Sequence, residues 1–182
     1  CSDTLVSTNY INIGPSLVPS FTVNSTKGCA PFNCIFTNTN PGGTSWFWDF
    51  GDGTTSSQPN PSHLYANPGN YTIILTVTTT NGCNGTVTLT NYIQVDALPV
   101  ANFTTIQDSG CIPFTVPFTN TSTGSVSWIW DFGNGTGSIL ENPSATYSTV
   151  GNYTVTLHAF SVNGCENIFS ITNAVVTKKA TA

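Results

Sequence analysis

The sequence matches itself at a fixed interval, and this repeat limits the possible folds more than any other feature. Cys1, Cys83 and Cys165 are equally spaced at that interval, and the stretch SWFWDFG at 45–51 returns as SWIWDFG at 127–133. A repeat unit as long as the stretch from Cys1 to Cys83 has the size of a small domain, which buries its own core. Two complete copies are therefore expected, one over residues 17–98 and one over residues 99–182.

The first residues fit the end of a repeat rather than its beginning. Residues 1–16 align with residues 83–98 and 165–180, so that Thr-Asn-Tyr-Ile at 8–11 returns at 90–93. We expect residues 1–16 to be the terminal strand of a preceding repeat. The chain is then a segment of a longer tandem array.

The pattern within each copy is that of β-strands. Apolar and polar residues alternate over 71–77 and again over 153–159, which predicts half-buried strands, and no segment has a sustained helical period. Clusters of Asn, Pro and Gly, such as those at 40–43 and 58–61, separate the strands. The chain is therefore expected to be all-β, with each copy forming a β-sandwich.

Composition excludes several classes of protein. The only cationic residues are Lys27, Lys178 and Lys179, so no basic cluster is available to neutralise a nucleic acid. A chain that is 12% aromatic and only 6% charged is unlike disordered proteins. No apolar run approaches the roughly 20 residues that cross a bilayer, so we expect no membrane insertion by this segment.

The repeated motif resembles the PKD domain, an immunoglobulin-like (Ig-like) β-sandwich of extracellular proteins. The first copy carries WDFGDG at 48–53 and GNYTI at 69–73, and the second carries WDFGNG at 130–135 and GNYTV at 151–155. The GCAPF and NGC stretches at 28–32 and 81–83 are similar to PKD repeats of very large Bacteroidetes surface proteins, including gliding-motility adhesins. The resemblance implies two tandem Ig-like (PKD) β-sandwich domains at the cell surface.

Two cysteine positions recur in both copies, and the four cysteines at these positions are expected to form disulfides. Pairing Cys29 with Cys83 and Cys111 with Cys165 treats the two copies alike, because the partners in each pair are then equally far apart in sequence. Disulfides of this kind imply an oxidising compartment and an extracellular location.

The other two cysteines are treated separately. Cys34 aligns with Val116 on a face that it shares with Phe32 and Phe36, so we expect a buried free thiol. Cys1 is expected to pair with a cysteine of the preceding repeat, and a bridge between Cys1 and Cys34 is the alternative.

The close carboxylates are expected to be structural. Asp49 and Asp52 flank a tight turn, and Asp131 occupies the first of these positions in the second copy. The second position is Asn134 in that copy, which indicates a turn former rather than an ionised acid. A calcium site is the weaker interpretation.

We expect no other metal and no cofactor. We also expect no enzymatic activity, because neither His63 nor His158 has a nucleophile arranged beside it.

Aromatic and hydroxyl residues supply the remaining candidate sites. Trp48 and Trp130 are expected in the core, whereas Trp46 and Trp128 lie nearer the strand starts and are candidates for stacking on sugar rings. Thr4 lies in a short Asp-Thr-Leu match to the O-glycosylation motif that Bacteroidetes use.

These observations favour a non-enzymatic stalk or adhesive segment of a long extracellular filament or adhesin. Its partners would be neighbouring repeats, and glycans or surfaces along its length. One alternative is an accessory module of a secreted hydrolase that binds polysaccharide or collagen. Another is a subunit of a self-assembling fibre or surface layer in which residues 4–13 are donated as a strand to a neighbouring chain.

Overall fold

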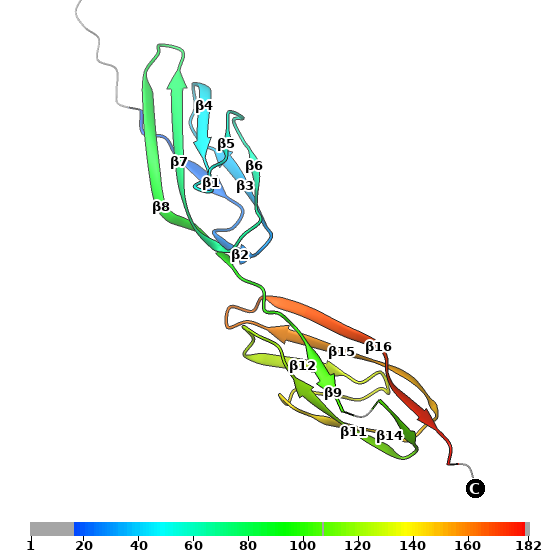
Figure 1. Cartoon of the computed structure of the whole chain (residues 1–182). Helices are drawn as coiled ribbons and strands as arrows, with labels where there is room; N and C mark the ends of the chain where they lie inside the picture. The colour runs from blue at the N-terminus through cyan, green and yellow to red at the C-terminus, as the bar shows by residue number, and fades with distance from the viewer. Residues whose placement is uncertain (1–16, 107, 181–182) are drawn as a thin grey trace, which may run out of the picture. The chain divides into compact units, whose positions relative to one another are not determined.

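The computed structural model describes residues 17–106 and 108–180, and these residues form β-strands joined by turns and loops, with no helix. No described segment therefore offers a helix long and apolar enough to cross a membrane. The chain divides into two compact units, and the second unit takes in Lys27–Phe32 and Ala66–Gly69 in addition to the residues from Val95 onward. Figure 1 shows a strand sandwich for each repeat.

The first repeat contains eight strands in two sheets. A three-stranded sheet has the order β1-β3-β6, and a five-stranded sheet has the order β2-β8-β7-β4-β5. The strands are β1 (Phe21–Val23), β2 (Lys27–Cys29), β3 (Phe32–Asn38), β4 (Gly43–Asp49), β5 (Thr55–Ser56), β6 (Ser62–Tyr65), β7 (Gly69–Thr79) and β8 (Asn84–Asp96).

The second repeat has the same topology. Its sheets have the orders β14-β11-β9 and β10-β16-β15-β12-β13. The strands are β9 (Phe103–Thr105), β10 (Ser109–Cys111), β11 (Phe114–Asn120), β12 (Ser127–Asp131), β13 (Gly137–Ser138), β14 (Ser144–Tyr147), β15 (Gly151–Phe160) and β16 (Glu166–Lys178). The expected all-β fold of two Ig-like sandwiches is confirmed.

The long strands follow the alternation seen in the sequence. Ile73, Leu75 and Val77 of β7 are fully buried, and the residues between them are partly exposed. In the second repeat the pairing of β15 with β16 shifts register between Tyr153 and Val155. Asn173 lies opposite this shift with a φ of 56°, a left-handed conformation that asparagine tolerates better than most residues.

Each sandwich is filled by an aromatic core around one tryptophan. Trp48 is 0% exposed and packs edge-on against Phe21, with ring centroids 5.2 Å apart. Trp130 is 1% exposed and packs edge-on against Phe103, also with ring centroids 5.2 Å apart. The expectation that Trp48 and Trp130 lie in the core is confirmed.

Polar atoms in the two cores have equivalent partners. The indole nitrogen of Trp48 donates to the carbonyl of Gln58 at 2.9 Å, and that of Trp130 donates to the carbonyl of Leu140 at the same distance. The hydroxyl of the buried Tyr65 donates to the Phe50 carbonyl at 3.1 Å. Burial raises the pKa of Tyr65, so the hydroxyl keeps its proton and remains a donor.

Candidate functional site

The turn that follows β4 and β12 is held by carboxylates. Asp49 accepts a hydrogen bond from the amide of Gly51 at 2.9 Å, and Asp131 accepts one from the amide of Gly133 at 2.8 Å. Gly51 has a φ of 78°, and a Cβ there would lie 2.5 Å from the carbonyl oxygen of Thr72. The turn therefore requires glycine at this position and an acceptor two residues before it.

The residue at the second position of the turn, Asp52 or Asn134, holds the turn through its Oδ1 atom. In the first repeat Oδ1 of Asp52 accepts from the amide and the hydroxyl of Thr54, at 3.0 and 2.6 Å. In the second repeat Oδ1 of Asn134 accepts from the same two groups of Thr136, also at 3.0 and 2.6 Å. This role needs a carbonyl-type oxygen and no charge.

Calcium binding by the turn aspartates stays a prediction. Within the two described ranges, no group of three or more His, Cys, Asp or Glu side chains is placed to hold a metal ion. Asp49, Asp52 and Asp131 use carboxylate oxygens for the turn bonds described above.

His63 completes a polar cluster that the sequence did not predict. Its Nε2 lies 2.7 Å from Oδ2 of Asp52, and its ring stacks on Phe50 with the planes 1° apart. Burial acts to raise the pKa of Asp52, but hydrogen bonds from Thr54 and His63 outweigh burial, and the pKa lies below its usual value. The signal for this pair was in the repeat itself, because Asp52 and His63 are replaced together in the second copy, by Asn134 and Ala145.

The cluster lacks the geometry of a nucleophilic relay. In such a relay one ring nitrogen of histidine contacts the acid and the other contacts the nucleophile. Here the same Nε2 lies near both Asp52 and the Thr54 hydroxyl, which is 3.5 Å away. The arrangement ties β6 to the turn that follows β4.

His158 forms a different ion pair in the second repeat. Its Nδ1 lies 2.5 Å from a carboxylate oxygen of Glu166 across the β15–β16 pair. The equivalent residues of the first repeat are Thr76 and Asn84, so this pair has no counterpart there. Each histidine is thus bonded to a carboxylate that its own repeat supplies.

The two tryptophans considered for ligand stacking are partly buried. Trp128 packs against the core of the second repeat, and its indole nitrogen lies 3.1 Å from the Ser125 hydroxyl. The indole nitrogen of Trp46 is buried and has no hydrogen-bond partner among the described residues. Both rings therefore contribute to packing, and stacking on a ligand stays a prediction.

The cysteine pairing differs from the one predicted. Cys29 is bonded to Cys165, with a sequence separation of 136 and Cα atoms 5.6 Å apart. Cys83 and Cys111 are exposed, and neither is bonded to another cysteine in the part of the chain that the structure describes. The predicted pairs, Cys29 with Cys83 and Cys111 with Cys165, are therefore wrong. Repeat symmetry is also satisfied when a cysteine of one copy bonds to a cysteine of the following copy. The equivalence of the cysteine positions therefore does not distinguish bonds within each copy from bonds between consecutive copies.

Cys34 lies within the first sandwich and has no disulfide partner among the described residues. It is 0% exposed, and its sulfur lies 3.5 Å from the carbonyl of Ser25. Burial raises its pKa to about 11. Its proposed alternative partner Cys1, the candidate Thr4, residues 1–16 and the candidate donated strand at 4–13 lie outside the described residues.

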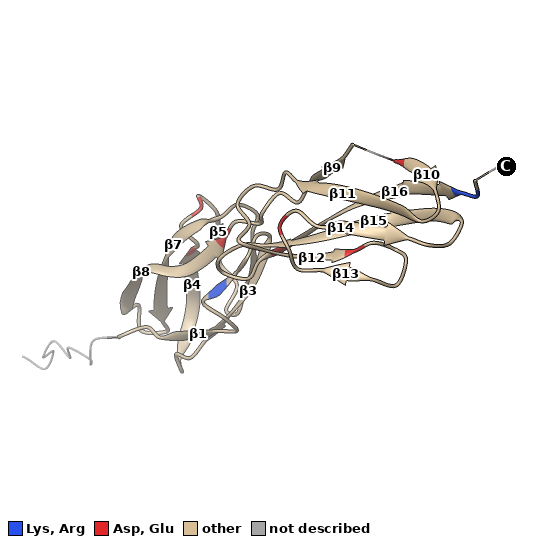
Figure 2. Cartoon of the chain, turned by 90° about the horizontal axis from the view of Figure 1, so that it is seen from below, with Lys and Arg blue, Asp and Glu red and all other residues tan. Residues whose placement is uncertain are grey.

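Charged residues are sparse over the described surface. Figure 2 shows isolated acidic and basic positions along the ribbon, with Lys27 the single cation of the first repeat.

Comparison with known proteins gives matches to parts of much longer proteins. Human polycystin-1 is 33% identical over 132 residues, covering 68% of this chain and 3% of polycystin-1. The microbial collagenase of Vibrio alginolyticus is 43% identical over 68 residues, covering 34% of this chain and 8% of the collagenase. The chain thus spans less than a tenth of either relative.

Solved structures and family models give matches of domain size. The PKD1 domain of the Vibrio cholerae metalloprotease PrtV aligns with 33% identity and a TM-score of 0.37, covering 41% of this chain and 93% of that domain. The family model of the PKD domain matches residues 14–95 and, a second time, residues 96–176. The chain therefore belongs to the PKD domain family and carries two consecutive members of it.

Proposed function

We propose that the two PKD domains form a non-enzymatic spacer in a long extracellular protein, as a stalk segment of a surface filament or adhesin. The observation that carries this proposal is the bond between Cys29 and Cys165, which joins a residue of the first repeat to a residue of the second. A bond of this kind prevents the stretch between Cys29 and Cys165 from extending when the chain is pulled from its two ends. It also fits an oxidising, extracellular compartment.

The use of polar side chains supports a structural role. The carboxylates of Asp49, Asp52 and Asp131 bind turn amides, and both histidines pair with carboxylates. These groups already have partners that hold strands and turns together. The finer assignment, to a Bacteroidetes gliding-motility adhesin, rests on the resemblance of the cysteine-flanked motifs.

The native size and location of the polypeptide test the spacer. An antibody raised to this segment would be applied to fractionated cells after denaturing, reducing electrophoresis. We expect a very large band in the surface fraction. A band of about the mass of this chain, 19.2 kDa, from polymeric material would contradict the spacer and favour an assembling subunit.

A second function is favoured by the similarity to the Vibrio alginolyticus collagenase, which is 43% over 68 residues. In this case the two domains would be an accessory module of a secreted hydrolase that binds collagen or polysaccharide. Trp46 and Trp128 are the aromatic candidates, since each is partly rather than fully buried.

Co-sedimentation with insoluble collagen and with cellulose or chitin tests this second function. Trp46→Ala and Trp128→Ala would be compared with Phe47→Ala, which removes a neighbouring aromatic ring that is 51% exposed. Loss of binding in the tryptophan variants alone would support the accessory module. The absence of binding by the unaltered chain would exclude it for these ligands.

A further inference from the structure

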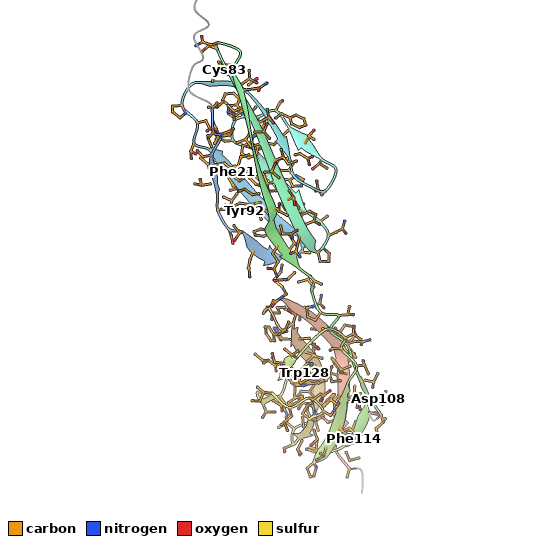
Figure 3. The ribbon with its side chains drawn as sticks, turned by 90° about the vertical axis from the view of Figure 1, so that its left-hand side faces the viewer. Phe21, Cys83, Tyr92, Asp108, Phe114 and Trp128 are labelled. Carbon is orange, nitrogen blue, oxygen red and sulfur yellow. A yellow bond between two sulfur atoms is a disulfide. The ribbon has the colours of Figure 1, made fainter. Side chains whose placement is uncertain are left out.

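Two exposed cysteines are unbonded among the described residues, although their repeat equivalents are bonded to each other. Cys111 is the equivalent of Cys29, and Cys83 is the equivalent of Cys165, each displaced by the repeat interval. Cys29 and Cys165 form the disulfide, whereas Cys83 and Cys111 are free thiols. Figure 3 shows Cys83 in the loop that joins β7 to β8.

The free Cys111 occupies the same backbone setting as the bonded Cys29. Cys29 ends β2, and the amide that follows it donates to the carbonyl of Asp96 at 2.9 Å. Cys111 ends β10, and the amide that follows it donates to the carbonyl of Lys178 at 3.0 Å. Asp96 and Lys178 are themselves equivalent, so both cysteines end a strand held against the end of the last strand of their repeat.

The free Cys83 likewise occupies the setting of the bonded Cys165. The Cys83 carbonyl accepts from the amide of Thr79 at 2.9 Å, and the Cys165 carbonyl accepts from the amide of Ser161 at 2.9 Å. The glycine before each cysteine has a positive φ, 76° at Gly82 and 81° at Gly164. The two loops therefore present their cysteines on equivalent backbones.

The bond in the structure follows a directional rule. It joins the cysteine of the Gly-Cys motif in one repeat to the cysteine of the Asn-Gly-Cys motif in the next repeat. We propose that Cys111 and Cys83 follow the same rule, and that each binds a further PKD repeat of this kind. Cys111 bonds the Asn-Gly-Cys cysteine of a following repeat, and Cys83 bonds the Gly-Cys cysteine of a preceding one.

This inference rests on the proposed function, because a spacer of tandem repeats supplies the neighbouring repeats. Consecutive repeats are then joined by one disulfide at every junction. Bond formation removes two protons and two electrons from the two thiols, and a disulfide donor such as oxidised glutathione or a disulfide oxidoreductase accepts them and becomes two thiols. The buried Cys34 is a poor competitor, because exchange proceeds through an accessible thiolate.

The test extends the full chain by one more copy of its second repeat. Residues 99–180 are repeated after residue 180, which continues the repeat interval without a break. The extended chain is folded in a glutathione redox buffer, free thiols are alkylated, and the disulfides are located by mass spectrometry. Pepsin is the suitable protease, because Lys27, Lys178 and Lys179 are the only trypsin sites in the parent sequence.

We expect Cys29 to remain bonded to Cys165 and Cys111 to become bonded to the Asn-Gly-Cys cysteine of the added copy. Replacing that added cysteine with serine is the matched control, and Cys111 should then be alkylated. A Cys111 that stays reduced in the fully cysteine-bearing chain, or that bonds Cys165, would overturn the inference.

A second experiment uses two copies of the unextended chain. Cys83→Ser retains Cys111, and Cys111→Ser retains Cys83, with Cys1 replaced by serine in both variants. If the rule holds, the mixture forms a Cys111–Cys83 dimer at least ten times faster than either variant alone forms a dimer. Equal rates of like-with-like dimers would contradict the directional rule.

These results are separable from those that test the spacer itself. A very large native polypeptide in which Cys111 stays reduced would retain the spacer and reject the junction disulfides. A short native polypeptide whose mixed variants still form the Cys111–Cys83 bond would reject the spacer and retain the directional pairing.

Discussion

Pulling the chain from its two ends gives the sharpest test of the cysteine pairing. The bond between Cys29 and Cys165, with its sequence separation of 136, shields the intervening chain from an applied force. An unfolded chain extends by about 3.5 Å per residue, so reduction should lengthen the fully extended chain by about 470 Å, after subtraction of the bridge itself. Single-molecule force spectroscopy of the oxidised chain with and without dithiothreitol measures this difference directly.

The alternative pairing predicts a different length. Bonds within each repeat, Cys29 with Cys83 and Cys111 with Cys165, would shield two shorter loops and release only about 370 Å in total. A release near that value, or no release, would refute the pairing. A chain carrying Cys29→Ser and Cys165→Ser should already have the reduced length when oxidised. The double variant Cys83→Ser and Cys111→Ser is the matched control and should behave like the parent.

Three further predictions concern the stability of the first repeat. Asp52→Asn supplies the residue that the second repeat uses at this turn, so it removes only the pair with His63. Because the pKa of Asp52 is lowered in the folded state, its stabilisation is present above about pH 4 and is lost as the pH falls below that value. Urea unfolding should give the variant a free energy of unfolding lower than that of the parent by up to about 1 kcal/mol at neutral pH, and the same value at about pH 2. A difference that stays constant across pH would contradict the pairing of Asp52 with His63. Tyr65→Phe leaves the buried Phe50 carbonyl without its hydrogen-bond donor and should lower the free energy of unfolding, measured in urea, by about 1–3 kcal/mol. Trp48→Ala empties the centre of the core and should lower the free energy of unfolding by about 3–5 kcal/mol. Calorimetry would show this as a lower transition temperature. A smaller decrease would mean that the surrounding rings collapse into the space.

The sandwiches were predictable because their signals are local. Alternation over β7 and β15 marks which side chains enter the core, and the Gly, Asn and Asp clusters mark the turns. The burial of Trp48 and Trp130 followed from their position in the repeated motif. Each of these features depends on neighbours within a few residues or on the familiar layout of a sandwich.

The disulfide and the Asp52–His63 pair were not predictable in this way. The disulfide joins residues 136 positions apart, and Asp52 and His63, although only 11 positions apart, lie on a turn and on a different strand. Spacing along the chain does not show which of these segments meet in space. For the cysteines, equivalence between copies allows a bond within each copy or a bond to the next copy. For Asp52 and His63, the joint replacement by Asn134 and Ala145 is consistent with a contact but does not by itself establish one.

The span of the disulfide has a consequence for a chain that is cut. The stretch from Cys29 to Cys165 is longer than the repeat interval, which is the distance in sequence from Cys83 to Cys165. If every junction carries the same bond, successive spans overlap, and every backbone position in the interior of the array lies within at least one of them. A single proteolytic nick would then leave the array in one covalent piece. Bonds confined to each repeat would leave the stretches between their loops unprotected, and one cut there would release everything beyond it.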